Sequence, residues 1–185
     1  MGYKIHKQYR LPGYDYSSNG NYFITICTIN KEEFLGRIIN GKMILSPIGK
    51  ITESIWKQIP DKFPNIILGT FQLMPDHFHA IITIKNPNMC RNLIYKIPNQ
   101  NPTKNDNQIF KSGIKNNPME LKSISLGKII RWFKGRVKFE AAKINQCFHW
   151  QSRFYERIIR DEKEYYFIED YIVNNPKNSI KELET

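Results

Sequence analysis

The segment FQLMPDHFHAIITI, residues 71–84, carries the clearest signals of fold and function in this chain. Its apolar and β-branched residues predict a strand from the first histidine onward. Side chains alternate between the two faces of a strand, so His77 and His79 share one face and Phe78 lies on the other. Two imidazoles roughly 7 Å apart along a strand can converge on one metal ion if a third group closes the site. The pattern fits two simply hydrogen-bonded histidines equally well.

The composition is strongly basic. Lysine and arginine total 28 against 17 aspartates and glutamates, which gives a formal net charge of +11. This balance predicts a polyanionic partner. Aromatic residues make up 13% of the chain, and because bases stack on aromatic rings, we favour nucleic acid over a basic protein that is merely soluble.

The length and the cysteines narrow the class further. A chain of 185 residues is long enough for one domain with a hydrophobic core. Its three cysteines form no CxxC pair, which argues against a zinc knuckle. The first ten residues lack the apolar segment of a signal peptide, and no run of 18 apolar residues occurs. We therefore expect a cytoplasmic protein without a membrane span.

The first half of the chain alternates strand and helix signals. Residues 21–29 and 66–74 are rich in β-branched and aromatic residues and predict strands. Between them, Asn40-Gly41 separates two apolar runs, a strong hairpin signal. Ser46-Pro47 then predicts a capped helix start, and the apolar face of that helix consists of Ile48, Ile51, Ile55 and Trp56. Ile59-Pro60 and Phe63-Pro64 are expected to end the helix. This order predicts an α+β domain with a mainly antiparallel sheet.

Residues 86–122 differ in character from the rest. They contain nine asparagines, four prolines and scattered lysines, with little to bury. Such a segment offsets its ordering entropy poorly. We interpret residues 1–185 as one domain interrupted by a flexible polar insertion at about 86–122.

A strong helix is predicted from Ser125, in SLGKIIRWFKGRVKFEAAKIN. Its apolar stripe consists of Leu126, Ile130, Phe133, Val137, Ala141 and Ile144. The basic residues on its other faces are Lys128, Arg131, Lys134, Arg136 and Lys138. Few acidic residues neutralise them, so we favour a surface that binds the phosphate backbone of a nucleic acid over an ordinary solvated face.

A short strand within residues 148–159 and a last helix complete the prediction. Asp161 and Glu164 have the spacing of a capping box. Pro176 disfavours helical geometry at the residue before it, so the helix should end at about Asn174.

Two polar residues lie on the docking face of this last helix. Ile168, Tyr171, Ile172 and Asn175 follow the spacing i, i+3, i+4 and i+7. From the spacing alone, a core tyrosine with a bonded hydroxyl and a helix-terminal asparagine are the favoured interpretation.

Longer motifs favour a functional interpretation of the histidines, Tyr171 and Asn175 over a structural one. MPDHFHAII and WQSRFYERIIRDEKEYYFIEDYIVNNPKN resemble the HUH single-tyrosine transposases, and more closely the REP-associated tyrosine transposases of the IS-two-hundred-like group. LPGYDYSSNGNYFITICT and SLGKIIRWFKG look like this family as well. The resemblance covers nearly the whole chain outside residues 86–122. It implies a ferredoxin-like α+β fold, with an antiparallel sheet and helices packed on one face.

The resemblance also implies roles for individual residues. His77 and His79 match the two histidines of the HUH motif, and Tyr171 matches the nucleophile. Asn175 matches the position that completes the metal site. Asp76 replaces the asparagine that many relatives carry before the first histidine.

The implied reaction is DNA strand transesterification. A divalent ion, Mg or Mn, held by His77, His79 and Asn175 would orient the scissile phosphate. Tyr171 would attack phosphorus, giving a 5′-phosphotyrosine and a free 3′-hydroxyl. The expected partner is single-stranded or hairpin DNA, bound by a monomer or homodimer.

Candidate DNA contacts and two alternatives complete the analysis. The candidate DNA-binding residues are Lys128, Arg131, Lys134, Lys138 and Arg153. Trp132, Trp150 and Phe154 could stack on bases or belong to the core, and we favour the core for Trp132. One alternative function is a non-catalytic DNA- or RNA-binding descendant of such a transposase. The other is a small metal-dependent hydrolase, which the shortage of carboxylates near the histidines disfavours.

Overall fold

The structure, a computed structural model, describes residues 13–85 and 124–181, with side chains up to Lys177. The predicted insertion at about 86–122 lies outside the described residues. The elements follow the order β1 (Gly20–Cys27), 3₁₀ turn (Ile29–Lys31), β2 (Gly36–Ile39), β3 (Lys42–Leu45), α1 (Pro47–Lys57), α2 (Ile59–Lys62), β4 (Ile66–Leu73), β5 (His77–Ile84), α4 (Leu126–Ala141), β6 (Tyr155–Ile159) and α5 (Glu162–Lys181).

The main sheet has the ferredoxin-like topology. Its four strands lie in the order β4-β5-β1-β6, and every neighbouring pair is antiparallel. Along the chain these strands are first β1, then β4 and β5, and last β6, with helices in the first and last connections. This is the split βαβ arrangement. The predicted α+β class, antiparallel sheet and ferredoxin-like fold are confirmed.

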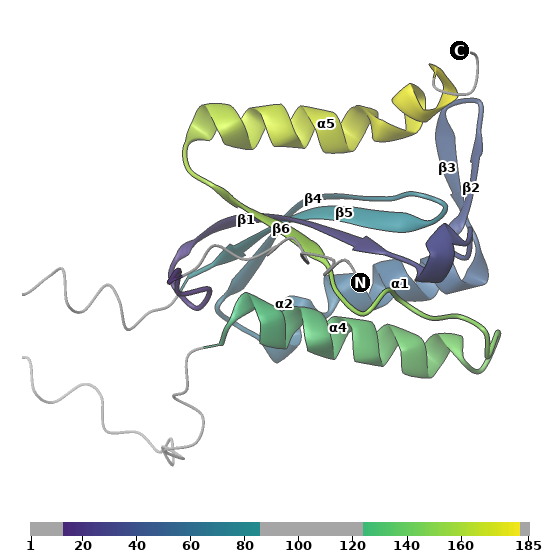
Figure 1. Cartoon of the computed structure of the whole chain (residues 1–185), viewed down its shortest axis with the longest axis horizontal. Helices are drawn as coiled ribbons and strands as arrows, with labels where there is room; N and C mark the ends of the chain where they lie inside the picture. Colours follow the sequence, from purple (N-terminus) through teal and green to yellow (C-terminus); the bar gives the residue numbers. More distant parts are fainter. Residues whose placement is uncertain (1–12, 86–123, 182–185) are drawn as a thin grey trace, which may run out of the picture.

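Helices cover both faces of this sheet. Figure 1 shows α1, α2 and α4 on one face and α5 on the other. The expectation that helices pack on one face therefore holds for three helices and is wrong for α5. The reason is that α5 follows β6 at the sheet edge and carries its own apolar side chains, Ile168 and Ile172, onto the second face.

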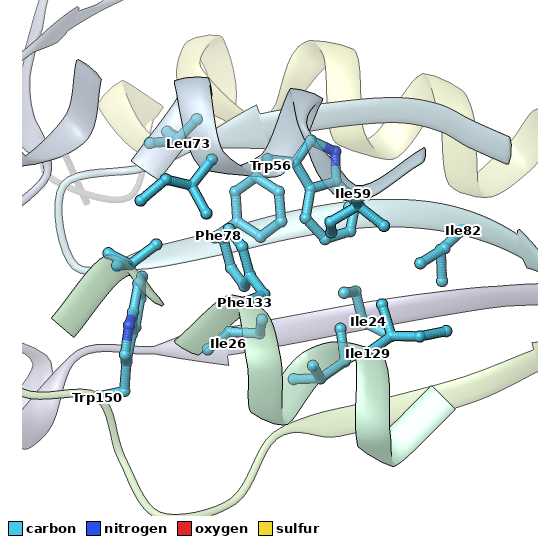
Figure 2. Packing of buried hydrophobic residues seen from close by; sticks show 14 of the residues in the cluster. Ile24, Ile26, Trp56, Ile59, Leu73, Phe78, Ile82, Ile129, Phe133 and Trp150 are labelled. Atoms are coloured by element: carbon cyan, nitrogen blue, oxygen red, sulfur yellow. The ribbon is translucent and has the colours of Figure 1, made fainter. Parts of the chain in front are cut away.

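The larger core lies between the sheet and α1, α2 and α4. The alternate residues Tyr22, Ile24 and Ile26 of β1 are all fully buried in it. Trp56 of α1 packs edge-on against Phe78 of β5, with ring centroids 4.8 Å apart, and against Phe133 of α4 at 5.2 Å (Figure 2). These rings join the two helices to the centre of the sheet. The predicted apolar faces of both helices thus meet in one core.

A smaller core lies on the opposite face, beneath α5. It consists of Phe23, Ile81, Ile159, Ile168 and Ile172. Because the larger core takes the other alternate residues of β1 and β5, the two central strands are buried on both faces. The histidines belong to this second, thinner layer.

The predicted hairpin and helix start are both present. Asn40 and Gly41 have φ values of 49° and 70°, the left-handed geometry of a tight two-residue turn between β2 and β3. The Ser46 hydroxyl accepts a bond of 3.0 Å from the Gly49 amide and so caps α1. α1 ends at Lys57, and α2 follows at once because Pro60 is tolerated in a first helical turn.

Helix α4 confirms most of the predicted stripe. Its buried residues are Leu126, Ile129, Ile130, Phe133, Val137 and Ala141. Ile144 was wrongly included, because the helix stops at Ala141 and Ile144 is 54% exposed. Trp132 packs against the core and meets the Phe63 ring at 5.6 Å, as favoured, and Trp150 is also buried there.

Helix α5 begins as predicted and ends later. Its start is a capping box in which the Glu164 amide donates to the Asp161 carboxylate and the Arg160 amide to the Glu164 carboxylate, both at 2.8 Å. The expected end near Asn174 is wrong, since the helix continues through Pro176 to Lys181. Proline removes one helical hydrogen bond, but burial of Pro176 against the protein outweighs that local preference.

Candidate active site

The two histidines lie where the strand alternation predicts. His77 and His79 project from β5 toward α5, while Phe78 and the residues alternating with it enter the larger core. The two imidazole centroids are 4.6 Å apart. The paired rings thus form one surface beneath α5.

His79 is the buried member of the pair, with 4% of its surface exposed. Its ring stacks on Phe23 of β1, with centroids 5.4 Å apart and planes at 25°. The Thr25 Oγ1 atom lies 2.8 Å from His79 Nδ1. Burial, with a smaller contribution from His77, lowers the pKa of His79 from 6.5 to about 3. The ring is therefore neutral at physiological pH.

His77 is more accessible and has a carboxylate partner. Its Nδ1 atom lies 2.5 Å from an Asp76 oxygen, and both side chains are 23% exposed. The hydrogen bond from His77 lowers the pKa of the Asp76 carboxyl. Because Nδ1–H donates to Asp76, the other ring nitrogen, Nε2, is left for a ligand.

Tyr171 of α5 meets His79 across the second core. Its hydroxyl oxygen lies 3.5 Å from His79 Nε2, although the two residues are 92 positions apart in the chain. The two ring centroids are 5.3 Å apart, and Tyr171 also packs edge-on against Phe23 at 6.2 Å. The phenol is 43% exposed. It therefore lies at the rim of the site, in reach of both an imidazole and solvent.

Asn175 lies one turn further along α5. Its side chain is 9% exposed, which agrees with its place on the docking face. Tyr171 and Asn175 are at i and i+4 and so lie on the same side of the helix. The third predicted ligand thus comes from the same helix as the predicted nucleophile.

A bulge in β4 seats α5 on the sheet. The pairing of β4 with β5 shifts register between Leu68 and Phe71. Within the bulge, the Thr70 hydroxyl donates to the Glu169 carboxylate at 2.5 Å. A Cβ atom on Gly69 would lie 3.0 Å from the Tyr165 hydroxyl, so the missing side chain allows the helix its close approach. These contacts fix the height of α5, and with it Tyr171, above the histidines.

The donor set suits a divalent metal ion. In the tautomer whose Nδ1–H donates to Thr25, the Nε2 atom of His79 carries the lone pair that a metal requires. No cluster of three or more His, Cys, Asp or Glu side chains with ligand geometry occurs among residues 13–85 and 124–177. A metal ion at this site would therefore need a third ligand of another type, such as the side-chain oxygen of an asparagine.

Sequence reasoning missed the residues that support the histidines. Thr25 and Phe23 lie on β1 directly beside β5, with Thr25 opposite His79 in the register. The alternation in NYFITICTI places Phe23 and Thr25 on one face, opposite to Ile24, so a signal was present. The register that pairs them with the histidines was not readable from the sequence.

The predicted DNA-binding residues lie elsewhere. Lys128 and Arg131 of α4 and Arg153 before β6 are exposed. The Lys134 ammonium donates to the Gln151, Ser152 and Arg153 carbonyls, and that of Lys138 to the Gln146 and Phe148 carbonyls. These two lysines hold the connection to β6 in place. Since α4 and α5 cover opposite faces, the α4 cations are not brought together with the histidines (Figure 1).

Among the described helices, none combines the length and the apolarity that crossing a bilayer requires. No protein-family model matches the chain.

Two comparisons with known proteins are informative. A REP-associated tyrosine transposase, solved bound to a REP hairpin, superimposes with a TM-score of 0.58 at 17% identity, over 94% of this chain and 74% of that one. An uncharacterized protein of Haemophilus influenzae is 39% identical over 170 residues, which cover 90% of this chain and 86% of that protein.

Together, the sheet order and the solved neighbour define the class: this chain has the fold of the REP-associated tyrosine transposases. Within that fold it belongs to the same family as the Haemophilus influenzae protein.

Proposed function

We propose that this protein is a metal-dependent transposase or endonuclease that cleaves and rejoins single-stranded DNA through a 5′-phosphotyrosine. The observation that carries the proposal is the approach of the Tyr171 hydroxyl to within 3.5 Å of His79 Nε2. A nucleophile and an imidazole from distant segments meet in one chain, as a self-contained site requires.

The reaction conserves phosphodiester bonds. The Tyr171 hydroxyl gives up its proton to water, its oxygen forms a bond to phosphorus, and the bond from phosphorus to the 3′-oxygen breaks. The 3′-oxygen takes up a proton and leaves as a hydroxyl. Attack by a second 3′-hydroxyl on the phosphotyrosine reverses the step and joins new ends. Because one phosphoester replaces another at each stage, no nucleotide cofactor is needed.

The other residues of the site would bind the metal ion and orient its ligands. His77, His79 and Asn175 would hold a divalent ion, Mg or Mn, which supplies charge to polarise the phosphate. Asp76 fixes the ring of His77, and Thr25 fixes that of His79, so that each Nε2 atom faces the ligand side. Burial keeps His79 neutral and thus able to act as a donor.

Single-stranded or hairpin DNA is the proposed substrate. The net charge of +11 favours a polyanion, and the solved neighbour with this fold was bound to a REP hairpin. A tyrosine at the rim of a half-open site reaches a phosphate of an unpaired strand more easily than a phosphate of a stacked duplex. The exposed cations Lys128, Arg131 and Arg153 are proposed contacts of the backbone.

Capture of the covalent intermediate tests the proposal. The protein is incubated with end-labelled hairpin DNA carrying a single-stranded flank, with MnCl₂ or MgCl₂, and resolved on a denaturing gel. A labelled protein band is expected, and chelation by EDTA should remove it. Tyr171→Phe, which keeps the ring and its packing on Phe23, should abolish the band.

A matched control separates the nucleophile from other tyrosines. Tyr166 lies on the same helix and is 65% exposed, so Tyr166→Phe removes an accessible phenol without touching the site. The adduct should persist in Tyr166→Phe. An adduct that survives Tyr171→Phe rules out Tyr171 as the nucleophile. No adduct with any hairpin in either metal would leave the non-catalytic nucleic-acid-binding alternative.

A further inference from the structure

Helix α4 carries an exposed aromatic ring on the side turned away from the sheet. Phe139 is 60% exposed. The stripe that packs on the core leaves Phe139 on the opposite side of the helix, with Lys128 and Gly135. An exposed phenylalanine gains nothing for the fold by burial, so the ring is available to a partner.

Two cationic side chains lie over this ring, where an incoming base would take their place. The Lys143 ammonium lies 5.0 Å from the Phe139 centroid, and the Arg136 guanidinium lies 5.8 Å from it. Both side chains are more than half exposed, at 62% and 51%. Glu140 is paired with both cations, at 2.6 and 3.2 Å, and is the one acidic residue in 126–143 against six basic ones. The surface around the ring is therefore strongly positive.

Open space adjoins the ring. Gly135 lies one turn before Phe139, and a Cβ atom built there would meet nothing within 4 Å. Neither packing nor backbone geometry requires glycine at this position, and glycine lowers helix stability. The absence of a side chain keeps the surface beside Phe139 clear.

We infer that this outer surface of α4 binds single-stranded DNA, with an unpaired base stacked on Phe139 above Gly135 and the adjacent phosphates held by Arg131, Arg136 and Lys143. Aromatic rings interleaved with cations are how proteins hold unpaired strands. Because α4 and α5 cover opposite faces of the sheet, this is a second contact, separate from Tyr171 and the histidines (Figure 1). This second contact extends the proposed function, and only the choice of DNA as the ligand rests on that proposed function.

The chemistry of the surface favours an unpaired strand over other occupants. A duplex buries its base faces by stacking, so it could use the cations but not the ring. An acidic protein segment would also use the cations, but a flat ring beside empty space adds little to its binding. The contribution of Phe139 therefore distinguishes these partners.

Fluorescence anisotropy tests the inference. The protein is titrated into a labelled, unstructured single-stranded oligonucleotide and, separately, into a blunt duplex of the same length, both in EDTA so that no strand is cut. Phe139→Ala should weaken single-strand binding about fivefold or more, the equivalent of about 1 kcal/mol, and leave duplex binding unchanged. Phe139→Trp should retain wild-type affinity or exceed it.

Gly135→Leu separates binding from folding. Leucine favours the helix more than glycine does, so the variant should melt at the wild-type temperature or above. Its side chain would fill the space beside Phe139, and single-strand affinity should fall as in Phe139→Ala. Phe167→Ala is the matched control: this phenylalanine is 73% exposed, but on α5, and its loss should change the affinity less than twofold.

Three outcomes would overturn the inference. They are wild-type single-strand affinity in Phe139→Ala, an equal loss for single strand and duplex, and an equal effect of Phe167→Ala. The assay contains no metal, so its result is independent of the covalent adduct. Phe139-dependent binding without any adduct would reject the catalytic proposal alone, and an adduct with Phe139-independent binding would reject this inference alone.

Discussion

At the scale of single residues, the histidine pair depends on partners that the HUH motif does not contain. Thr25 meets one ring nitrogen of His79, Asp76 meets one of His77, and Phe23 supports the His79 ring from β1. Such outer contacts fix which nitrogen faces a metal ion. Thr25 and Phe23 lie on the neighbouring strand β1, so only the folded sheet brings them to His79, whereas Asp76 directly precedes His77 in the chain.

Thr25→Val should weaken metal binding. Valine keeps the shape of threonine but removes the hydroxyl that meets His79 Nδ1, so the ring loses its fixed orientation. We expect Mn²⁺ affinity, measured by isothermal titration calorimetry, to fall about 10-fold or more. Thr25→Ser should restore it. Thr83→Val, which removes a hydroxyl bonded to Asn21 on the same face of the sheet, is the control and should bind Mn²⁺ normally. Equal affinity in Thr25→Val and wild type would contradict the role of Thr25.

His79 should make the fold sensitive to acid. Its pKa is about 3 in the folded protein and near 6.5 when unfolded, so between these values the unfolded state binds more protons. The contribution of His79 is complete above about pH 6.5 and is lost as the pH falls toward 3, by at most about 1.4 kcal/mol per pH unit. Urea unfolding of metal-free protein measures it. His79→Gln, which cannot titrate, should show a shallower decline over pH 4–6; a parallel decline would show that His79 is not its source.

At the scale of elements, the seating of α5 on β4 decides whether Tyr171 reaches the histidines. The bulge at Gly69 and Thr70 lets Tyr165 approach the sheet, and the bond between Thr70 and Glu169 ties the helix there. Helix α5 also continues through Pro176, where local preference predicts an end. Both features come from packing between distant segments, which outweighs local propensity.

Two glycine substitutions test this seating. Gly69→Ala places a Cβ atom 3.0 Å from the Tyr165 hydroxyl and from Ile81 Cβ, so we expect a loss of about 1 kcal/mol in unfolding free energy and a smaller yield of covalent adduct. Gly135→Ala meets open space on α4 and should instead add about 0.5–1 kcal/mol. Thermal unfolding and the adduct gel measure both. An unchanged adduct in a destabilised Gly69→Ala would show that the helix height is unimportant.

At the scale of the whole molecule, the two faces of the sheet carry different features. One face carries the large core, α1, α2 and α4, with cations and Phe139 on its outer side. The other carries the histidines beneath a single helix. Nucleic acid that engages both would have to pass around the sheet edge. The net charge of +11 provides the long-range attraction for such binding.

The lysines of α4 should separate into binding and structural groups. Lys128 is exposed, so Lys128→Gln should reduce the slope of log affinity against log salt by about 0.7 for single-stranded DNA and leave the melting temperature unchanged. Lys134 is half-buried against the carbonyls of residues 151–153, and burial lowers its pKa. Lys134→Gln should lower the melting temperature. Anisotropy over a salt series and thermal unfolding measure the two effects, and the opposite assignment would refute this division.

Local sequence patterns predict the strands, the hairpin turn, the start of both long helices and the face on which His77 and His79 lie. Those features depend on neighbours a few residues away, through side-chain alternation, helical spacing, caps and turns. The motif also identified Tyr171 and Asn175 as residues to examine. Their roles as nucleophile and ligand stay predictions until the adduct and metal-binding measurements are made.

Packing between distant segments places α5 on the second face, brings Tyr171 within 3.5 Å of His79 and sets Thr25 beside that histidine. It also assigned Lys134 and Lys138 to carbonyl groups and left Phe139 exposed. These facts join residues far apart in the chain, 92 positions in the case of Tyr171 and His79, and their distances in space are set by how helices and strands pack against one another. No local pattern in the chain contains that information.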